Sequence, residues 1–193
     1  TLNRYTVHKS NYDTHEQFFT TNLRALVECF KDDWRGILEE HAVDYDDRSI
    51  LRPTVKLTTN IHVYKDLTRH RLASFAIEST RYCNYTKDKF GGEITFIEPC
   101  WKMTKLQHEQ FVSAMCYAET YYKYLIESGF TTTQAAEVLP QATKADVIIT
   151  TTIPHWEHVF NLRAKGTTGK PHPEVEYIMK QVMNEFYERG WTK

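Results

Sequence analysis

The sequence from residue 69 to residue 85 reads Arg69-His70-Arg71-Leu72-Ala73-Ser74-Phe75-Ala76-Ile77-Glu78-Ser79-Thr80-Arg81-Tyr82-Cys83-Asn84-Tyr85. It gathers three arginines and one histidine into thirteen residues. A guanidinium group is a rigid fork of donors that suits phosphate and carboxylate, and three such groups repel one another unless an anion lies among them. A solvated basic helix face is the ordinary alternative. The interspersed apolar residues instead indicate partial burial, and buried arginines need partners. Because Glu78 is the only acidic residue in the stretch, we expect a bound anion here, and phosphate in particular.

The chain on either side of this stretch predicts three strands. Apolar or β-branched residues alternate with polar ones over residues 53–63, which is the pattern of a half-buried strand. We expect this strand to lead into the arginine stretch, which we place at a helix start and the turn after it. Gly91-Gly92 then precede a short strand over residues 93–98, and the β-branched run at residues 147–152 predicts another.

Helical spacing of apolar residues predicts six helices. After a strand or extended arm at residues 1–13, Thr14 is expected to cap a helix carrying Phe18, Phe19, Leu23, Leu26, Val27 and Phe30. Asp32 or Asp33 caps a shorter helix, and residues 41–52 form an acidic loop. Thr104 caps the longest helix, whose methionine-aromatic face fits a core or a subunit interface, and Gly129 ends it. Further helices cover residues 131–139 and 155–165, and Pro173 opens the last one.

The composition fits one α/β domain over residues 1–193. The chain is 41% hydrophobic and 25% charged with a net charge of −1, so no basic field indicates nucleic acid. No apolar run approaches the roughly eighteen residues that a bilayer span needs. The four cysteines form no Cys-x-x-Cys pair. They are typical of reduced thiols, and we expect a cytoplasmic protein without membrane or nucleic-acid partners.

Arg69-His70-Arg71, seven further residues, Ser79 and then Arg81-Tyr82 are similar to the signature of the flavin-dependent thymidylate synthases. The resemblance continues over residues 82–91, resumes at residues 138–140 and 158–163, and covers roughly residues 54–186. The first fifty residues match poorly. The resemblance implies an α/β fold of the α+β type, with a small central, largely antiparallel sheet flanked by helices.

The resemblance also implies an activity and a site. In that family reduced FAD passes a hydride to dUMP, 5,10-methylenetetrahydrofolate supplies the carbon and NADPH recharges the flavin, in homotetramers whose sites several subunits share. Carried over by position, Arg163 is the catalytic residue that favours ionisation at N3 of the uracil. The flavin would be lined by Arg69, His70, Arg71 and His158. The nucleotide would be bound by Arg69, Asp66, Ala76, Ile77, Glu78, Ser79, Thr80, Arg81 and Arg163.

The histidine pair His155 and His158, Cys83 and Ser79 are also weighed as candidates for chemistry. His155-x-x-His158 has no acidic third ligand nearby, so we prefer a structural or flavin-side role to a metal site and expect no metal. Nothing beside Cys83 indicates a thiolate, so a buried, inert thiol is the better interpretation. Ser79 lacks a fixed base and is better explained as a hydrogen-bond partner of the substrate than as a nucleophile.

The chain departs from the family pattern near the ligands. Lys65-Asp66 stands where Arg-Gln or His-Glu is usual, and Ala76-Ile77 where Asn-Glu or Ser-Gln is usual. The other departures are Ala136 for an arginine, Thr152 and Pro154 for an Asn and an Arg, and Ser49-Ile50 for Glu-His. Each lost contact costs about 1–3 kcal/mol. Three alternatives to dUMP methylation therefore stay open. The substrate could be another pyrimidine nucleotide such as dCMP, whose amino group would donate a hydrogen bond to the Asp66 carboxylate. The enzyme could instead transfer hydroxymethyl, or the chain could be a non-catalytic nucleotide- or flavin-binding homologue.

Overall fold

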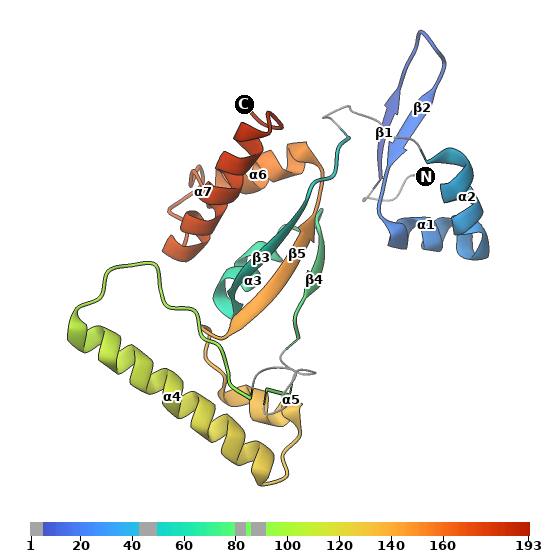
Figure 1. Ribbon diagram of the computed structural model, residues 1–193. Coiled ribbons are helices and arrows are strands. Elements are labelled where there is room, and N and C mark those ends of the chain that lie inside the picture. Colours follow the sequence, from blue (N-terminus) through green and yellow to red (C-terminus); the bar gives the residue numbers. More distant parts are fainter. Residues whose placement is uncertain (1–5, 43–49, 80–83, 86–91) are drawn as a thin grey trace.

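A three-stranded antiparallel sheet lies at the centre of the computed structural model, which describes residues 6–42, 50–79, 84–85 and 92–193 (Figure 1). Its strands are β3 (Thr54–Asn60), β5 (Lys144–Thr150) and β4 (Ser74–Ile77), in the order β3-β5-β4. In the register, Leu57 lies opposite Val147 and Phe75 opposite Ile149. Helices flank the sheet, so the predicted fold class is confirmed.

One face of the sheet packs against three helices. These are α3 (Ile61–Leu67), α6 (Ile153–Arg163) and α7 (Pro173–Glu188). Alternate residues of β3 and β5, such as Leu57 and Val147, are buried in the same apolar cluster as Trp156, Phe160 and Phe186 of these helices. The opposite face carries Thr54, Lys56, Thr58, Ile148 and Ala76, all exposed. This alternation is what a sheet with one covered face requires.

The strand predicted over residues 53–63 is shorter than expected. The Asn60 side chain accepts a hydrogen bond from the amide of Val63 at 3.0 Å and thereby caps α3. Its amide nitrogen also donates to Oε2 of the buried Glu174 on α7 at 3.1 Å. Residues 61 and 63 therefore continue the apolar pattern on a helix, because spacings of two and of three to four residues coincide over so short a run.

Residues 69–79, the described part of the arginine stretch before the gap, contain no helix, so the helix start predicted there is wrong. Residues 68–73 form turns, closed by bonds from the amide of His70 to the Leu67 carbonyl and from the amide of Ala73 to the His70 carbonyl, both 3.0 Å. The chain then enters β4, which pairs with β5. Phe75 and Ile77 suit a strand, and the unpaired edge of β5 decides against a helix.

The first described residues form a hairpin and two helices beside the sheet (Figure 1). They are β1 (Val7–Ser10), β2 (Gln17–Thr20), α1 (Leu23–Phe30) and α2 (Trp34–His41), with a 3₁₀ turn at Lys31–Asp33. The helix predicted to start at Thr14 begins only at Leu23, because Phe18 and Phe19 lie in β2 and Asn22 caps α1 by accepting from the amide of Ala25 at 2.8 Å. The other predicted apolar residues, Leu23, Leu26, Val27 and Phe30, do lie in α1. The second helix is confirmed at Trp34, although Asp33 makes no capping bond through its side chain.

The longest helix, α4 (Lys105–Glu127), begins where the sequence predicts. Thr104 and Gln107 form a capping box, and Gly129 follows the helix end with φ +91°. Tyr122 is buried with Tyr85, Ile94 and Ala135, the last in α5 (Thr132–Ala135). The strand predicted at residues 93–98 is only a single bridge between Phe96 and Thr143, because its pairing is limited to two backbone bonds between residues that the structure describes. These run from the amide of Lys144 to the Thr95 carbonyl and from the amide of Ile97 to the Ala142 carbonyl.

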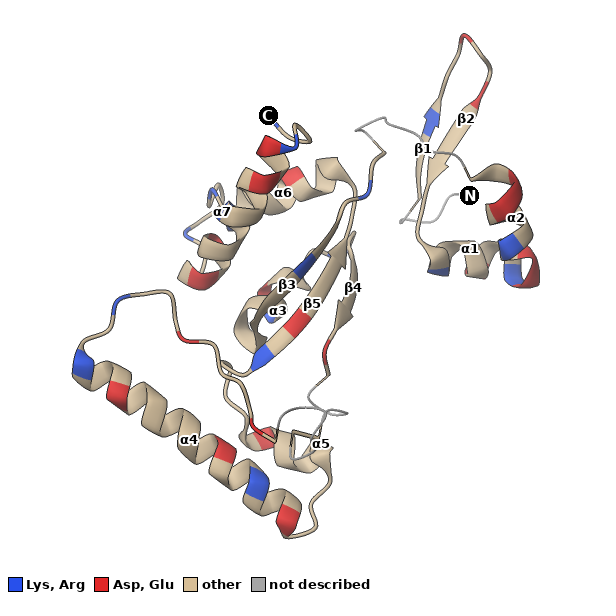
Figure 2. Ribbon diagram, in the orientation of Figure 1, with Lys and Arg blue, Asp and Glu red and all other residues tan. Residues whose placement is uncertain are grey.

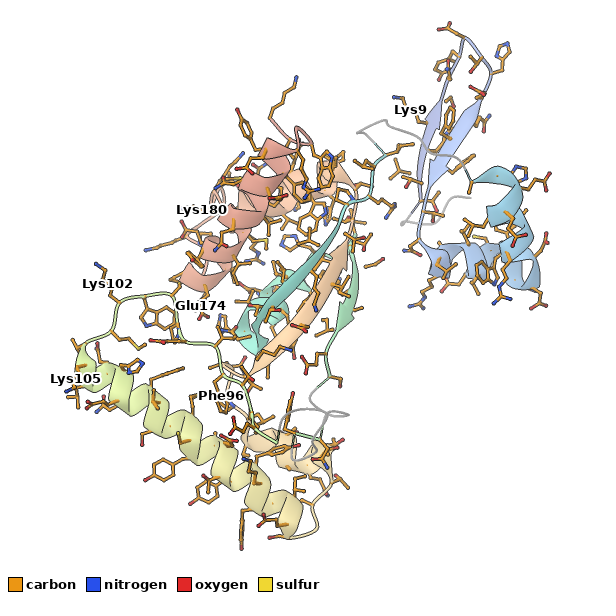
Figure 3. All side chains as sticks on the ribbon, viewed as in Figure 1. Lys9, Phe96, Lys102, Lys105, Glu174 and Lys180 are labelled. Atoms are coloured by element: carbon orange, nitrogen blue, oxygen red, sulfur yellow. The ribbon has the colours of Figure 1, made fainter. Side chains whose placement is uncertain are left out.

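Helix α4 buries Tyr122 of its predicted apolar face and half-buries Phe111, Met115, Ala118 and Leu125, while Ala114 and Tyr121 are exposed. Its side away from the sheet carries aromatic rings (Figure 3), and the exposed tyrosines are Tyr117, Tyr121 and Tyr124. They lie four and three residues apart and therefore form one stripe. Within the parts of the chain that the structure describes, no helix combines the length and apolar character that crossing a bilayer requires.

Candidate functional site

Arg163, in the last turn of α6, is held by two residues from the segment around α3. Its Nε donates to Nε2 of His70 at 3.1 Å, and its Nη2 donates to the backbone carbonyl of Asp66 at 3.2 Å. Nη1 lies 3.4 Å from the Asp66 carboxylate oxygen Oδ2. The Arg163 side chain is 19% exposed. Three bonds to a planar fork fix both its position and its plane.

His70 is neutral in this arrangement, because its Nε2 accepts from Arg163 and so carries no proton. Burial, and then the positive charge of Arg163 and the nearby His155 and His158, lower the pKa of His70 to about 4. Rings of His155 and His158 lie 6.0 Å from the ring of His70, measured between centroids. A protonated His70 would have no lone pair on Nε2 to accept the bond from Arg163, and its charge would repel the guanidinium, so the neutral form is favoured.

The depressed pKa of His70 predicts a loss of stability in mild acid. Between the ordinary histidine pKa of 6.5 and a value of about 4, the unfolded chain takes up a proton that the folded protein refuses. The free energy of unfolding should therefore fall by about 3 kcal/mol as the pH drops through this window, and level off below it. We expect His70→Asn to lose this part of the pH dependence, measured by urea denaturation at several pH values.

The matched control is His41→Asn, since the side chain of His41 is 63% exposed. The control should keep the pH dependence of the unmodified protein. Equal slopes of unfolding free energy against pH in the His70 variant and the unmodified protein would contradict the assignment of His70.

His155 and His158 add two imidazoles on the first turns of α6. Their rings are near parallel with centroids 5.6 Å apart, and burial, with a smaller effect of His158, lowers the pKa of His155. Nε2 of His155 is buried and has no hydrogen-bond partner among the described residues. A buried ring nitrogen left unpaired costs free energy, so this atom suits a bound polar ligand. We name Asp66, His70, His155, His158 and Arg163 the arginine–histidine cluster.

Arg69 and Arg71 flank the buried His70 and are both exposed. The side chain of Arg69 is 75% exposed, and its Nε lies 3.8 Å from Oδ1 of Asp66. That ion pair is too exposed and too long to contribute much to stability. The partial burial predicted for these two arginines is therefore wrong. Both guanidinium groups are accessible to an anion, and an anion bound there stays a prediction.

The predicted substrate residues on β4 lie apart from the arginine–histidine cluster. Ser79 follows the end of β4, and four strand residues carry the chain roughly 13 Å from the turn that holds His70, at about 3.3 Å per residue. Ala76 is exposed and Ile77 half-buried, while Glu78 is bound to Lys144. Thr80, Arg81 and Cys83 lie outside the described residues. The structure therefore divides the predicted site residues into two groups.

The departures from the family pattern have plain structural settings. Thr152 is buried at the N-cap of α6 without a capping bond from its side chain, Pro154 is in the first turn of α6, and Ile50 is buried. Ala136 begins a 3₁₀ turn, Ala136–Val138, after α5. In the described part of the chain, no three His, Cys, Asp or Glu side chains gather as metal ligands would. Cys29, Cys100 and Cys116 are free thiols.

The family model described as thymidylate synthase complementing protein matches residues 50–189. The chain belongs to this family. Membership of the thymidylate synthase complementing protein family confirms the resemblance identified from the arginine stretch. The match begins at residue 50, so β1, β2, α1 and α2 lie outside it, in agreement with the poor match of the first fifty residues.

Three curated relatives in the thymidylate synthase complementing protein family are named flavin-dependent thymidylate synthase. The protein of Pyrococcus furiosus is 34% identical over 118 residues, which are 61% of this chain and 48% of the relative. That of Pyrococcus abyssi is 31% identical over 98 residues, 50% of this chain and 39% of the relative. That of Geobacter sulfurreducens is 31% identical over 97 residues, 50% and 40% respectively. The chain thus spans about half or less of the length of these relatives.

A solved structure shares the fold. The UMP/dUMP methylase PolB from Streptomyces cacaoi, crystallised with 5-Br dUMP, superimposes with a TM-score of 0.61 at 19% identity. The superposition covers 86% of this chain and 83% of PolB. A sheet with these helices around it is therefore the architecture of a known nucleotide methylase, and the family's fold extends to this divergent sequence.

Proposed function

We propose that this chain is a flavin-dependent thymidylate synthase-like enzyme that converts dUMP to dTMP. In this proposal 5,10-methylenetetrahydrofolate is the carbon donor, and FAD reduced by NADPH supplies the hydride. The observation that carries the proposal is the guanidinium of Arg163, held in one plane by His70 and Asp66. Family membership and the names of the relatives support the same activity.

Arg163 is suited to a pyrimidine that gains negative charge. A guanidinium stays protonated at any physiological pH and carries five N–H donors. Bonds to His70 and Asp66 use three of them and leave two for a ligand. Because the fork is fixed before the ligand arrives, it stabilises charge on the uracil ring without reorganising, which is the usual source of electrostatic catalysis.

The residues present also fit a flavin. Arg69 and Arg71 offer exposed donors for its phosphates, and the exposed His158 offers an imidazole face or edge for a planar ring system, while the buried His70 lies 6.0 Å from His158 between ring centroids. Nε2 of the half-buried His155 makes no hydrogen bond to the described residues and is therefore a further polar group that a flavin could bond. Bound there, FAD would supply the hydride transfer that amino-acid side chains cannot perform.

We further propose that the enzyme is a homotetramer with sites shared between subunits. The nucleotide-binding candidate Ser79 lies at the other end of β4 from His70, which supports a site that two chains complete. A second copy would supply the missing group. The exposed tyrosine stripe of α4 offers apolar area for contacts between copies. We place this assembly in the cytoplasm, with residues 1–193 acting as one catalytic unit.

A second candidate function is favoured by Asp66. Its carboxylate is 18% exposed, lies in the arginine–histidine cluster and is only loosely bonded to Arg163 and Arg69. A carboxylate accepts a hydrogen bond from the amino group of cytosine, whereas uracil has at the same position the carbonyl oxygen O4, which is itself an acceptor. An enzyme that acts on dCMP, with transfer of methyl or hydroxymethyl, is therefore the alternative.

One experiment tests both candidates. The purified protein should take up FAD, turn yellow and bleach with NADPH. On incubation with 5,10-methylenetetrahydrofolate, NADPH and either dUMP or dCMP, mass spectrometry should find dTMP from dUMP and no product from dCMP. A product from dCMP alone would favour the second candidate. A protein that binds nucleotide but takes up no flavin would overturn both and leave a non-catalytic binding protein.

A further inference from the structure

The carboxylate of Glu78, which the sequence predicts to bind substrate, is hydrogen-bonded to two residues of β5. Its carboxylate oxygen Oε2 accepts from Nζ of Lys144 at 2.8 Å and from the backbone amide of Asp146 at 3.2 Å. Its own amide donates to the Asp146 carbonyl at 2.9 Å. Glu78 thus extends the pairing of β4 with β5 one residue beyond the strand, through both its backbone and its side chain.

Charged groups from three strands or strand ends meet at this point. Lys144 lies 3.1 Å from Oδ2 of Asp146, Lys56 lies 3.5 Å from the same oxygen, and Thr58 donates to Oδ1 at 2.8 Å. Figure 2 shows the basic and acidic segments side by side at the start of β5. Burial alone would lower the pKa of Lys144, but its bonds to Glu78 and Asp146 outweigh burial and raise it. Burial would likewise raise the pKa of Asp146, yet Thr58 and Lys144 lower it.

The network matters because β4 is short and lies at the edge of the sheet. Its four residues pair with β5 on one side only. A short edge strand has few backbone bonds to hold its end. The residue immediately after Glu78 is Ser79, which is the serine of the arginine motif. The position of the Ser79 hydroxyl is therefore set by the last fixed point before it, and that point is the carboxylate of Glu78.

We propose that Glu78, Lys144 and Asp146 are positioning residues that hold Ser79 for the nucleotide, and that Glu78 does not itself bind substrate. The inference rests on the proposed function, because it takes Ser79 as a nucleotide contact. Lys144 and Asp146 lie 66 and 68 residues beyond Glu78 and have no place in the arginine motif. Their role is visible only once β4 and β5 are paired.

The test compares dUMP dissociation constants and steady-state constants for Lys144→Met, Glu78→Ala, the double variant and Lys144→Arg. We expect each single variant to weaken dUMP binding and raise KM about tenfold, with kcat changed by less than about threefold. The double variant should be no worse than either single variant, since both remove the same bond. Lys144→Arg should restore most of the affinity. FAD uptake should be unchanged throughout, which also reports that the variants fold.

The control is Lys180→Met, which breaks the 2.6 Å bond of Lys180 to Glu176 on the surface of α7 and should leave every constant unchanged. Weaker dUMP binding in Glu78→Ala alone, with Lys144→Met unaffected, would overturn the proposal in favour of direct substrate contact. The proposal would also be overturned if the losses of dUMP affinity caused by Glu78→Ala and Lys144→Met added up in the double variant. Failure of the proposed function is a separate result, because the unmodified protein would then bind no dUMP and give no dTMP.

Discussion

Replacing Arg163 with methionine is expected to lower kcat for dUMP methylation at least about 100-fold, which is the usual effect of removing one preorganised donor at a developing charge. Methionine keeps the length of the side chain and removes all donors. It also leaves the Asp66 carboxylate without its nearest cation and His70 without the donor to its Nε2. The measurement is steady-state turnover with FAD occupancy determined in the same sample.

Two further variants sharpen the Arg163 prediction. Lysine at position 163 keeps the charge but has its donors at one point, so it cannot bond His70, Asp66 and a ligand in one plane, and we expect it to recover little activity. Arg189→Met is the matched control, because Arg189 is exposed at the end of α7, where its side chain bonds to Glu185 and lies over the ring of Trp191. Turnover within about threefold of the unmodified enzyme in the Arg163→Met variant would remove Arg163 from the mechanism.

Replacing Trp156 with alanine is expected to lower the free energy of unfolding by about 3–5 kcal/mol, as for other large aromatic residues deleted from a core. Trp156 is 0% exposed and packs against Phe160 and Phe186, with ring centroids 5.6 and 5.3 Å away. Its Nε1 donates to the carbonyl of Pro53 at 3.3 Å, which ties α6 to the start of β3. Urea denaturation of the unmodified protein and the variant measures the difference.

A smaller substitution separates packing from the hydrogen bond of Trp156. Trp156→Phe keeps most of the aromatic volume and removes only the donor, so it should cost less than the alanine variant. Trp101→Ala is the control, since Trp101 is 45% exposed in the segment before α4. A loss below about 1 kcal/mol for Trp156→Ala would show that α6 does not depend on this residue for its place on the sheet.

Helices whose signals are local are predictable from the sequence. Thr104 with Gln107, and Pro173 at the first turn of α7, mark helix starts by residues that act within one turn. The errors arise where a distant partner decides. Residues 74–77 become a strand because β5 offers an edge, and Phe18 and Phe19 join β2 because β1 pairs with it.

The candidate site follows the same division. The structure brings His70 and Arg163 together although 93 positions separate them, while the roles that the motif assigns to them stay predictions. The motif does not reveal that Asp66 is the partner of Arg163, nor that Ser79 lies at the other end of a strand. Those facts depend on the course of the chain between the motif residues, which no short pattern encodes.

The double bonding of Asn60 has a consequence for ligand entry. Asn60 joins the first turn of α3 to Glu174 of α7, while Arg163 holds the last turn of α3 through Asp66. The helix is thereby anchored at both ends to different neighbours. Because the backbone of α3 is held at both ends, a nucleotide that moves the Asp66 carboxylate away from Arg163 is expected to do so by rotating the Asp66 side chain alone.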